Sequence, residues 1–530
     1  MPWTGRWTVM VLAAALSTGG AGLPVRGEVP PTRGEVLFRC AFDKPQSVRG
    51  LQGLQSGQVE LVPGREGRTA LCVRIPAGKP AGAGARIDLD AKRLAGCRIR
   101  LVAVVKADNV AKPPNPWNGV EVMLHMVASD GGHWVQPNGE HGTFDWKKVG
   151  TVVDVPADAK AISLHLGLEQ THGAVWFEQV EITCLTPPRT RPASRPTGPV
   201  YKGHNLPRLR GTMINRRVSA DDLRVLASWG ANHVRWQLNW NSFPHSPADN
   251  GDLAAYDKWI EGTLKKLDEL LPVCHELGIL VTVDLHTPPG GRDKALSFRL
   301  FQEKRFQDKF VELWKGIARR YRGNASVWGY DLVNEPVEGL MGEELMDWPA
   351  LAEHTARAVR EIDGDHAIII EPAPWGSIEG LKHFQPLNVP RVVYSVHMYQ
   401  PHAFTHQGVY GPPTNLSYPG PIAGKHWDKA AIRRAFQVAR DFQLDYGAHI
   451  YIGEFSAIRW APGDSACNYL RDVIDVMEEY GWDWAYHAFR EWQGWSVEHG
   501  GDRNDTRPSA TPTDRQKLLQ SWFKQNRRPN

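Results

Sequence analysis

The sequence predicts an α/β protein in which a (β/α)8 barrel follows an antiparallel β-sandwich. Three observations support this fold class. The chain has 530 residues, which is too long for one compact core. Short strand-like segments fill the region from about residue 36 to 185, whereas apolar strands alternate with helical periods after about residue 205. A proline-rich stretch separates the two patterns.

The first residues have the pattern of a signal peptide. Arg6 supplies a positive charge, residues 7–16 are apolar, and small residues at 19–21 suit cleavage. We therefore expect a signal peptide over residues 1–22 and a secreted protein, either extracellular or periplasmic. The alternative is an N-terminus without regular structure. The apolar run is too short to span a bilayer, and no later segment is long enough.

Residues 35–185 are expected to form the β-sandwich. The segments 120–126, 161–166 and 175–184 are rich in β-branched and aromatic types or alternate apolar with polar residues, and no long helical period interrupts them. Four of the six cysteines lie in this region, and their spacings do not resemble a zinc site. Because Cys40 and Cys184 lie near its first and last strands, we favour a disulfide between them.

Residues 186–200 contain five prolines and are expected to form an extended linker. The barrel domain then covers residues 201–527. Its eight expected strands are 209–214, 233–236, 279–286, 327–334, 367–371, 392–397, 450–455 and 484–489. The expected helices are 219–229, 256–277, 301–321, 351–362, 430–446, 467–480 and 515–523. The connection between strands five and six is the least regular, because its helix would have to lie within residues 376–384.

The overall charge gives little indication of a charged partner. The formal net charge is +4, and several arginines lie in the linker, so we expect no nucleic-acid binding. We also expect a monomer. Neither a metal nor an organic cofactor is indicated, since carboxylates at the barrel rim can supply the chemistry described next.

Two glutamates stand where barrel strands are expected to end. Glu335 follows an apolar run and Asn334, and Pro336 prevents the strand from continuing. Glu454 ends a second apolar run. Chemistry in such barrels lies at the carboxyl ends of the strands. Two carboxylates brought to one rim by different strands are what cleavage of a glycosidic bond requires.

The region from about 205 to 525 resembles glycoside hydrolase family 5, the cellulase family of retaining (β/α)8 enzymes. The resemblance rests on Asn334-Glu335-Pro336, Gly453-Glu454-Phe455, His397-Met398-Tyr399, Arg235 and His286. It implies that Glu335 is the general acid and then the base, and that Glu454 is the nucleophile. Retention of configuration is then expected, with the carboxylates about 5 Å apart.

The resemblance also implies roles for the surrounding residues. Arg235 and Tyr399 would keep Glu454 ionised, and Asn334 would bind the sugar 2-hydroxyl. His286 and His397 would complete the floor of the central subsite. Simpler alternatives remain, in which Arg235 is a structural ion-pair partner and both histidines belong to the core.

Aromatic residues are expected to stack on the sugar. The family places a Trp at the end of strand eight, and here Trp492 is the first candidate and Trp495 the second. Trp375 either stacks on a sugar or packs a loop. The long stretch 400–426 is rich in aromatic residues and is expected to form a wall of the cleft.

The N-terminal region resembles jelly-roll modules found beside polysaccharide enzymes. Trp117, Trp134 and Trp146 would then form a sugar platform, or alternatively fill the sandwich. For the whole chain, endo-β-1,4-glucanase (cellulase) activity is the first hypothesis. A β-mannanase, a xyloglucanase or an exo-β-glycosidase would use the same site. A hypothesis of another class is a non-catalytic polysaccharide-binding protein.

Overall fold

The computed structural model describes residues 30–43, 50–54, 57–78, 81–137, 139–240, 251–293, 296–342 and 344–529. The expected signal peptide, residues 1–22, lies outside this part of the chain. None of the helices in the described part is long and apolar enough to cross a membrane.

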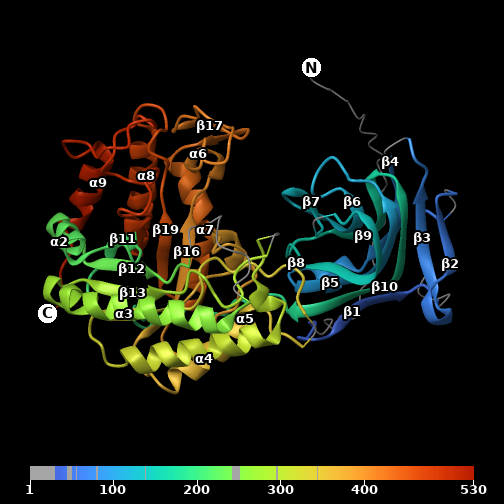
Figure 1. Ribbon diagram of the computed structural model, residues 1–530, viewed down its shortest axis with the longest axis horizontal. Helices are drawn as coiled ribbons and strands as arrows, with labels where there is room; N and C mark the ends of the chain where they lie inside the picture. Colours follow the sequence, from blue (N-terminus) through green and yellow to red (C-terminus); the bar gives the residue numbers. More distant parts are fainter. Residues whose placement is uncertain are drawn as a thin grey trace, which may run out of the picture.

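The N-terminal region forms two antiparallel sheets that pack face to face (Figure 1). One sheet has the order β2-β3-β10-β5-β8, with β1 paired to β10, and the other has the order β4-β9-β6-β7. The strands are β1 (Val36–Ala41), β2 (Val59–Pro63), β3 (Thr69–Ile75), β4 (Ala81–Leu89), β5 (Arg98–Val110), β6 (Gly119–Ala128), β7 (Gly131–Val135), β8 (Gly142–Asp154), β9 (Ala161–Thr171) and β10 (Gly173–Thr186). A 3₁₀ turn η1 (Arg65–Gly67) and a short helix α1 (Ala91–Leu94) connect some of them.

Alternation of side chains along the strands explains this sandwich. On β5, Ile99, Leu101, Ala103 and Val105 are fully buried, while the residues between them are more exposed. Successive side chains of a strand point to opposite faces, so one face of β5 supplies the core and the other does not. Matching apolar residues of β6, β9 and β10 complete this core.

The expected Cys40–Cys184 disulfide is wrong. None of the six cysteines forms a disulfide, and Cys40 lies opposite Val180 in the β1–β10 ladder, four positions from Cys184. The sulfur of Cys184 instead interacts with Cys97. The strand register sets this separation, and it cannot be read from the fact that the two cysteines lie near the first and last strands.

The C-terminal region is a closed barrel of eight parallel strands in the order β11-β12-β13-β14-β15-β16-β19-β20. The strands are β11 (Arg210–Ile214), β12 (His233–Gln237), β13 (Leu280–Asp284), β14 (Val327–Asp331), β15 (Ala367–Ile370), β16 (Val392–Met398), β19 (Ile450–Phe455) and β20 (Asp483–Tyr486). The predicted fold class is confirmed. Several strands end earlier than expected, so Asn334 and Glu335 lie beyond the end of β14.

Helices surround the barrel in the expected alternation. They are α2 (Ala220–Trp229), α3 (Leu253–Leu277), α4 (Lys304–Tyr321), α5 (Trp348–Arg360), α7 (Lys429–Tyr446), α8 (Ser465–Tyr480) and α9 (Asp514–Phe523). Between β15 and β16 the connection holds only the 3₁₀ helix η3 (Ile378–Lys382), in agreement with its weak sequence pattern. A second 3₁₀ turn, η2 (Arg299–Phe301), precedes α4. The stretch 400–426 contains α6 (His402–Thr405) and the hairpin β17 (Gly420–Ile422) and β18 (Lys425–Trp427).

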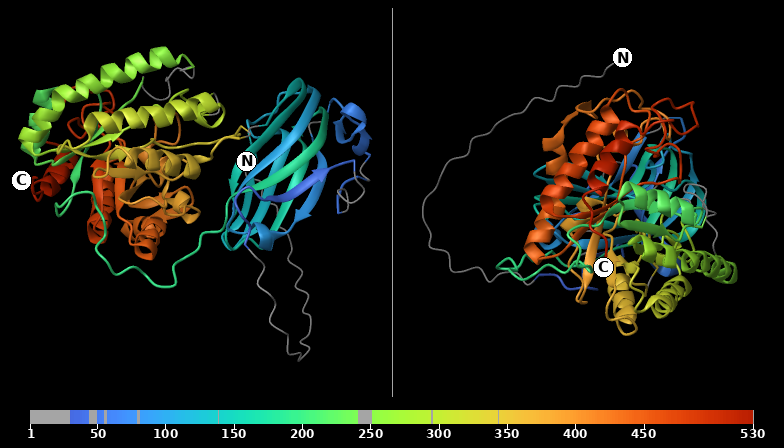
Figure 2. Two further views of the ribbon diagram at one scale, coloured as in Figure 1. Left: turned by 90° about the horizontal axis from the view of Figure 1, so that it is seen from below. Right: turned by 90° about the vertical axis from the view of Figure 1, so that its left-hand side faces the viewer.

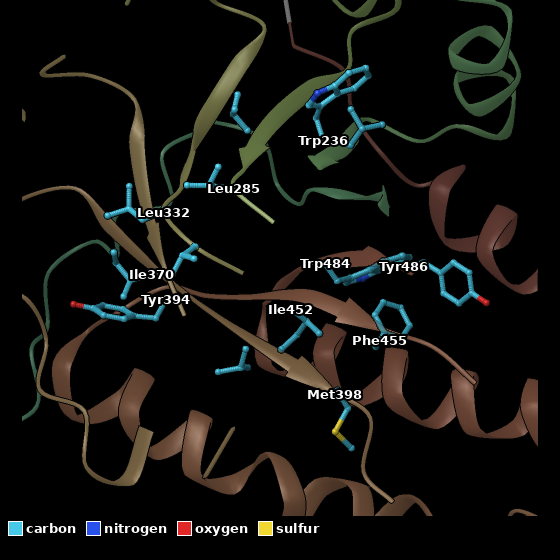
Figure 3. Packing of buried hydrophobic residues seen from close by; sticks show 14 of the residues in the cluster. Trp236, Leu285, Leu332, Ile370, Tyr394, Met398, Ile452, Phe455, Trp484 and Tyr486 are labelled. Carbon is cyan, nitrogen blue, oxygen red and sulfur yellow. The ribbon is translucent and has the colours of Figure 1, made fainter. Parts of the chain in front are cut away.

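Each barrel strand divides its side chains between the interior and the helices. Trp236 and Phe455 lie in the large core cluster that joins strands and helices (Figure 3). Their chain neighbours Arg235 and Glu454 belong to the opposite face of the strands. A separate apolar cluster, which includes Leu280 and Tyr451, contains residues from six barrel strands. The polar residues described below occupy the carboxyl-terminal end of the strands.

The proline-rich linker is bound to the barrel rather than free. The Arg189 guanidinium donates to the Leu381 carbonyl at 2.8 Å and to Asp445 at 3.2 Å. The Tyr446 hydroxyl donates to the Thr190 carbonyl at 2.9 Å. The linker thus runs along the barrel towards the sandwich, and the two domains lie side by side (Figure 2).

Candidate active site

Glu335 and Glu454 face one another at the carboxyl-terminal rim of the barrel. Glu454 is on β19, and Glu335 follows the end of β14. A carboxylate oxygen of each lies, with a nitrogen of His397, in a group whose atoms are all within 4.8 Å of one another. This separation suits direct attack by one carboxylate on a sugar carbon, because it leaves no room for an intervening water.

Arg235 lies beneath this pair and is fully buried on β12. Its guanidinium donates to Glu454 at 2.8 Å, to Asp331 at 2.9 Å and to the Asn334 side-chain oxygen at 3.0 Å. It also contacts Asp284 at 3.0 Å and Glu371 at 2.8 Å. One planar cation therefore orients several acceptors at once, as a guanidinium does well.

The Glu454 carboxylate remains ionised although it is buried. Burial favours its neutral form, but the nearby charges of His397, His487 and Arg235 outweigh burial and hold the pKa of Glu454 well below its ordinary value. The Tyr399 hydroxyl donates to the same carboxylate at 2.9 Å. An ionised carboxylate with positioned donors has the properties of a nucleophile.

Glu335 is held in place by both its backbone and its side chain. Its φ of 50° lies in the left-handed region, which is strained for a residue with a side chain. Its N–H donates to Glu371 at 2.8 Å, and its carbonyl accepts from Arg292 at 2.9 Å. The carboxylate contacts His397 Nδ1 at 3.0 Å and is about one quarter exposed, with a side-chain exposure of 24%. This carboxylate is therefore fixed yet accessible to a substrate.

His286 and Asn334 also lie in the site. His286 Nδ1 donates to Asp284 at 2.9 Å, and the Asn334 amide donates to His286 Nε2 at 3.3 Å. The structure thus places Arg235, His286, Asn334, His397 and Tyr399 at one rim, together with the two glutamates.

The two predicted stacking residues are placed differently from each other. The Arg292 guanidinium lies over the Trp375 ring, 4.7 Å from the ring centre. The backbone N–H of Trp375 donates to the Pro336 carbonyl at 3.1 Å. It is therefore next to the Glu335 segment. Trp492 lies farther out, is 39% exposed and packs against Trp460 and Trp495.

The sequence profile of the family described as "Cellulase (glycosyl hydrolase family 5)" matches residues 196–493, more than half of the chain. The chain belongs to glycosyl hydrolase family 5. It is a retaining O-glycoside hydrolase of the cellulase family, in agreement with the resemblance predicted from its motifs.

Relatives of this hydrolase carry several names. Endoglucanase C of Acetivibrio thermocellus is 25% identical over 289 residues, which cover 50% of this chain and 81% of the relative. Cellodextrinase A of Ruminococcus flavefaciens is 24% identical, with 53% and 80% covered. A beta-xylosidase of Phanerodontia chrysosporium is 27% identical, with 51% and 56% covered.

Solved structures of glycoside hydrolases are also similar. One is 26% identical, covers 59% of this chain and 99% of its own, and has a TM-score of 0.47. Thermotoga maritima Cel5A, solved with cellobiose as a mutant form, is 24% identical, with 59% and 96% covered and a TM-score of 0.46.

No role was predicted for three residues of the hydrolase site, although each lies in or just after an expected strand. Glu371 bridges Arg235, His397 and the Glu335 N–H, and its sequence signal was available, since Glu371-Pro372 after an apolar run repeats the pattern of Glu335-Pro336. His487 Nδ1 lies 2.5 Å from the Tyr399 hydroxyl and 3.4 Å from Glu454. Glu491 accepts from Gln237 at 2.5 Å.

Strand eight therefore delivers His487 next to the nucleophile candidate. Trp495 packs against both His487 and Tyr399, with ring centres 5.8 Å and 6.2 Å apart. Of the two tryptophans considered for strand eight, Trp495 is thus the one in ring contact with the site, and Trp492 lies behind it. A role for Trp492 in binding sugar stays a prediction.

The stretch 400–426 places a column of rings near Glu335. His402 and His406 stack with centres 3.8 Å apart, and Tyr410 stacks on His406 at 6.3 Å. Tyr410 is 65% exposed, and the Glu335 charge acts on both His402 and Tyr410. This column is consistent with a cleft wall.

Two groups in the described chain have the spacing of metal ligands, but hydrogen bonds explain both. One is Glu335, His397 and Glu454. Burial lowers the pKa of His397, but Glu371 and Glu454 outweigh this and raise it well above its ordinary value, so both ring nitrogens carry protons. The other is His204, His449 and Asp483, in which the Leu206 N–H donates to His204 Nδ1 and leaves Nε2 to donate to Asp483.

The three tryptophans considered on the sandwich differ in how exposed their side chains are. Trp117 is 55% and Trp134 is 64% exposed, whereas Trp146 is half-buried beside Arg65. Trp134 stacks on His125, with ring centres 4.7 Å apart. Sugar binding by this domain stays a prediction.

Proposed function

We propose that this chain is an endo-β-1,4-glucanase in which Glu335 is the acid/base and Glu454 the nucleophile. The observation that carries the proposal is the close approach of the two carboxylates, within 4.8 Å, with the pKa of Glu454 held well below its ordinary value. Names of relatives such as endoglucanase C support the glucan substrate.

In the first step of this mechanism, Glu454 attacks the anomeric carbon while Glu335 gives its proton to the departing glycosidic oxygen. A glycosyl-enzyme ester forms, and the shortened chain leaves as an alcohol. In the second step Glu335 takes a proton from water, which displaces Glu454 and restores both groups. Two inversions give net retention.

Within this proposal, Asn334 binds the sugar 2-hydroxyl, and Arg235 and Tyr399 orient the nucleophile. His286 and His397 form the floor of the central subsite, and Trp375 and Trp492 bind neighbouring sugars. A β-mannanase, a xyloglucanase and an exo-acting glycosidase remain alternatives with the same catalytic pair. We also propose that the chain is exported and acts as a monomer.

Site variants test the catalytic assignment. Glu335→Gln is expected to lower kcat on a β-1,4-glucan by about 10²–10⁴-fold, and Glu454→Ala by at least about the same factor, because each removes a group needed in the transition state. Glu312→Gln is the matched control, since Glu312 is an exposed residue of α4. A variant that loses less than tenfold would not carry the role assigned to it.

Azide separates the two roles. In Glu454→Ala it is expected to enter the space of the lost carboxylate and attack the sugar from the same face, which gives a glycosyl azide of inverted configuration. Formation of the retained azide would contradict Glu454 as nucleophile. Product lengths from cellulose derivatives, mannan and xyloglucan then test the glucan and endo assignments.

A further inference from the structure

Two buried carboxylates follow the Glu335 segment of the barrel, and the N-terminal domain neutralises both. They are Glu338 and Asp347, with side-chain exposures of 1% and 0%. Glu338 forms an ion pair with Arg98, the first residue of β5, and Asp347 forms one with Arg33, just before β1. In the part of the barrel that the structure describes, no Lys or Arg pairs with either carboxylate.

We propose that the sandwich domain positions the general acid of the barrel through Arg98 and, to a smaller extent, Arg33. This inference rests on the proposed role of Glu335. Arg98 does not touch the reacting atoms and is therefore a positioning residue, which acts through Glu338.

The loop that carries Glu338 and Asp347 depends on the sandwich for its arrangement, because the sandwich supplies the cations that pair with these carboxylates. A buried carboxylate without a cation is strongly unfavourable, and breaking such a pair by removing one partner destabilises the structure around the remaining charge. Nearby, a cavity of about 530 Å³ lies between Arg100, Lys148 and Glu181 of the sandwich and residues 340–342 of the loop. The domains thus do not pack continuously along this loop, and the ion pairs link them beside the cavity.

Hydrogen bonds connect the Arg98–Glu338 pair to Glu335. The Glu338 carboxylate accepts from the backbone N–H of Trp348 at 2.6 Å. The indole N–H of Trp348 donates to the backbone carbonyl of Glu371 at 2.6 Å. The Glu371 carboxylate then accepts from the Glu335 N–H at 2.8 Å. Each donor and acceptor in this series of hydrogen bonds is buried or nearly so. Glu335 has a strained φ of 50°, which such contacts must maintain.

The nucleophile is held by other contacts. Arg235 and Tyr399 orient Glu454, and neither belongs to the Glu338 loop. Arg235 also contacts the Glu371 carboxylate, but Asp284 and Asp331 hold the same guanidinium in place. Loss of Arg98 should therefore displace the proton donor more than the nucleophile. Only reactions whose leaving group needs a proton should slow down.

This selectivity gives the test, carried out on the full chain. Arg98→Met is expected to lower kcat/KM for a β-1,4-linked oligosaccharide by about tenfold to a hundredfold, since small displacements of a catalytic group have effects of this size. For a dinitrophenyl β-glycoside, whose phenolate leaves without a proton, kcat/KM should change by less than about twofold. Arg98→Lys should recover part of the loss, and Arg98→Met combined with Glu338→Gln should recover most of it.

Arg74→Met is the matched control, because it breaks the exposed Arg74–Glu60 pair on the same domain and should change neither substrate. An equal loss on both substrates, or no loss on either, overturns the proposal. If Arg98→Met does not fold, as judged by circular dichroism, Arg33→Gln carries the test with the same criterion and a smaller loss. Glu335→Gln, measured in parallel, must itself spare the activated substrate; otherwise the assignment of the acid fails and not the positioning role.

Discussion

At the scale of single residues, the site depends on how charge is distributed around Arg235. Four carboxylates, those of Asp284, Asp331, Glu371 and Glu454, contact this one guanidinium. Burial raises the pKa of Asp331 well above its ordinary value, although the Arg235 charge acts in the opposite direction. Glu454 lies next to the cationic groups of His397, His487 and Arg235, and their charges lower its pKa although burial acts in the opposite direction.

His487→Gln tests this distribution through pH. The imidazolium of His487 is one of the charges that lower the Glu454 pKa, so its removal should raise that pKa. Because the nucleophile must be ionised, the acid limb of kcat/KM should move to higher pH. The measurement is kcat/KM on a β-1,4-glucan oligosaccharide from pH 3 to 8.

His426→Gln serves as the control, since His426 is an exposed residue of β18, with 67% side-chain exposure. Its profile should coincide with that of the unchanged enzyme. A movement of the His487→Gln acid limb to lower pH would contradict the electrostatic account of Glu454.

At the scale of elements, local sequence signals decide where the barrel helices begin. Helix α2 starts with a capping box, in which the Ser219 hydroxyl accepts from the Asp222 N–H at 3.2 Å and Asp222 accepts from the Ser219 N–H at 2.8 Å. Such a box satisfies donors that the first turn leaves unpaired. Asp222 also pairs with Arg490, so this helix start contacts the segment after β20.

Ser219→Ala should therefore lower the free energy of unfolding by about 1 kcal/mol, a decrease of about 2 °C in Tm, with kcat unchanged. Ser228→Ala is the matched control. Ser228 lies in the same helix, and its hydroxyl donates only to the Val225 carbonyl, at 2.7 Å. Equal melting temperatures for Ser219→Ala and the unchanged protein would show that the cap contributes nothing.

At the scale of the whole molecule, Asp483 joins the segment before the barrel to the amino-terminal end of its strands. Asp483 lies at the start of β20 and accepts from His204 at 2.7 Å, from His449 at 2.6 Å and from the Leu209 N–H at 2.7 Å. Burial raises the pKa of Asp483, but the two histidines outweigh this and hold it well below its ordinary value. The folded state therefore favours the ionised form of Asp483 more than the unfolded state does.

The sign of the pH effect follows from linkage. A lowered carboxyl pKa contributes stability above the unfolded value of about 3.9, and this contribution is lost as the pH falls from there towards the folded value. Asp483→Asn should thus lower Tm at pH 7 and by a smaller amount at pH 3, where part of the contribution is already lost. Asp475→Asn, which breaks the partly exposed pair with Lys429, should have little effect at either pH. An Asp483→Asn loss that is as large at pH 3 as at pH 7 would exclude this explanation.

The sequence by itself determined the barrel class, the alternation of strands and helices, and the two glutamates, because apolar runs, caps and breakers act over a few neighbouring residues. It also indicated Arg235, His286 and Tyr399, since each follows or ends such a run. Only the tertiary structure decided which remote groups meet. Strand register separates Cys40 from Cys184, strand eight brings His487 to Glu454, and packing of the domains pairs Arg98 with Glu338. These contacts join residues far apart in the chain, and their free energy depends on burial and on charges that no local pattern contains.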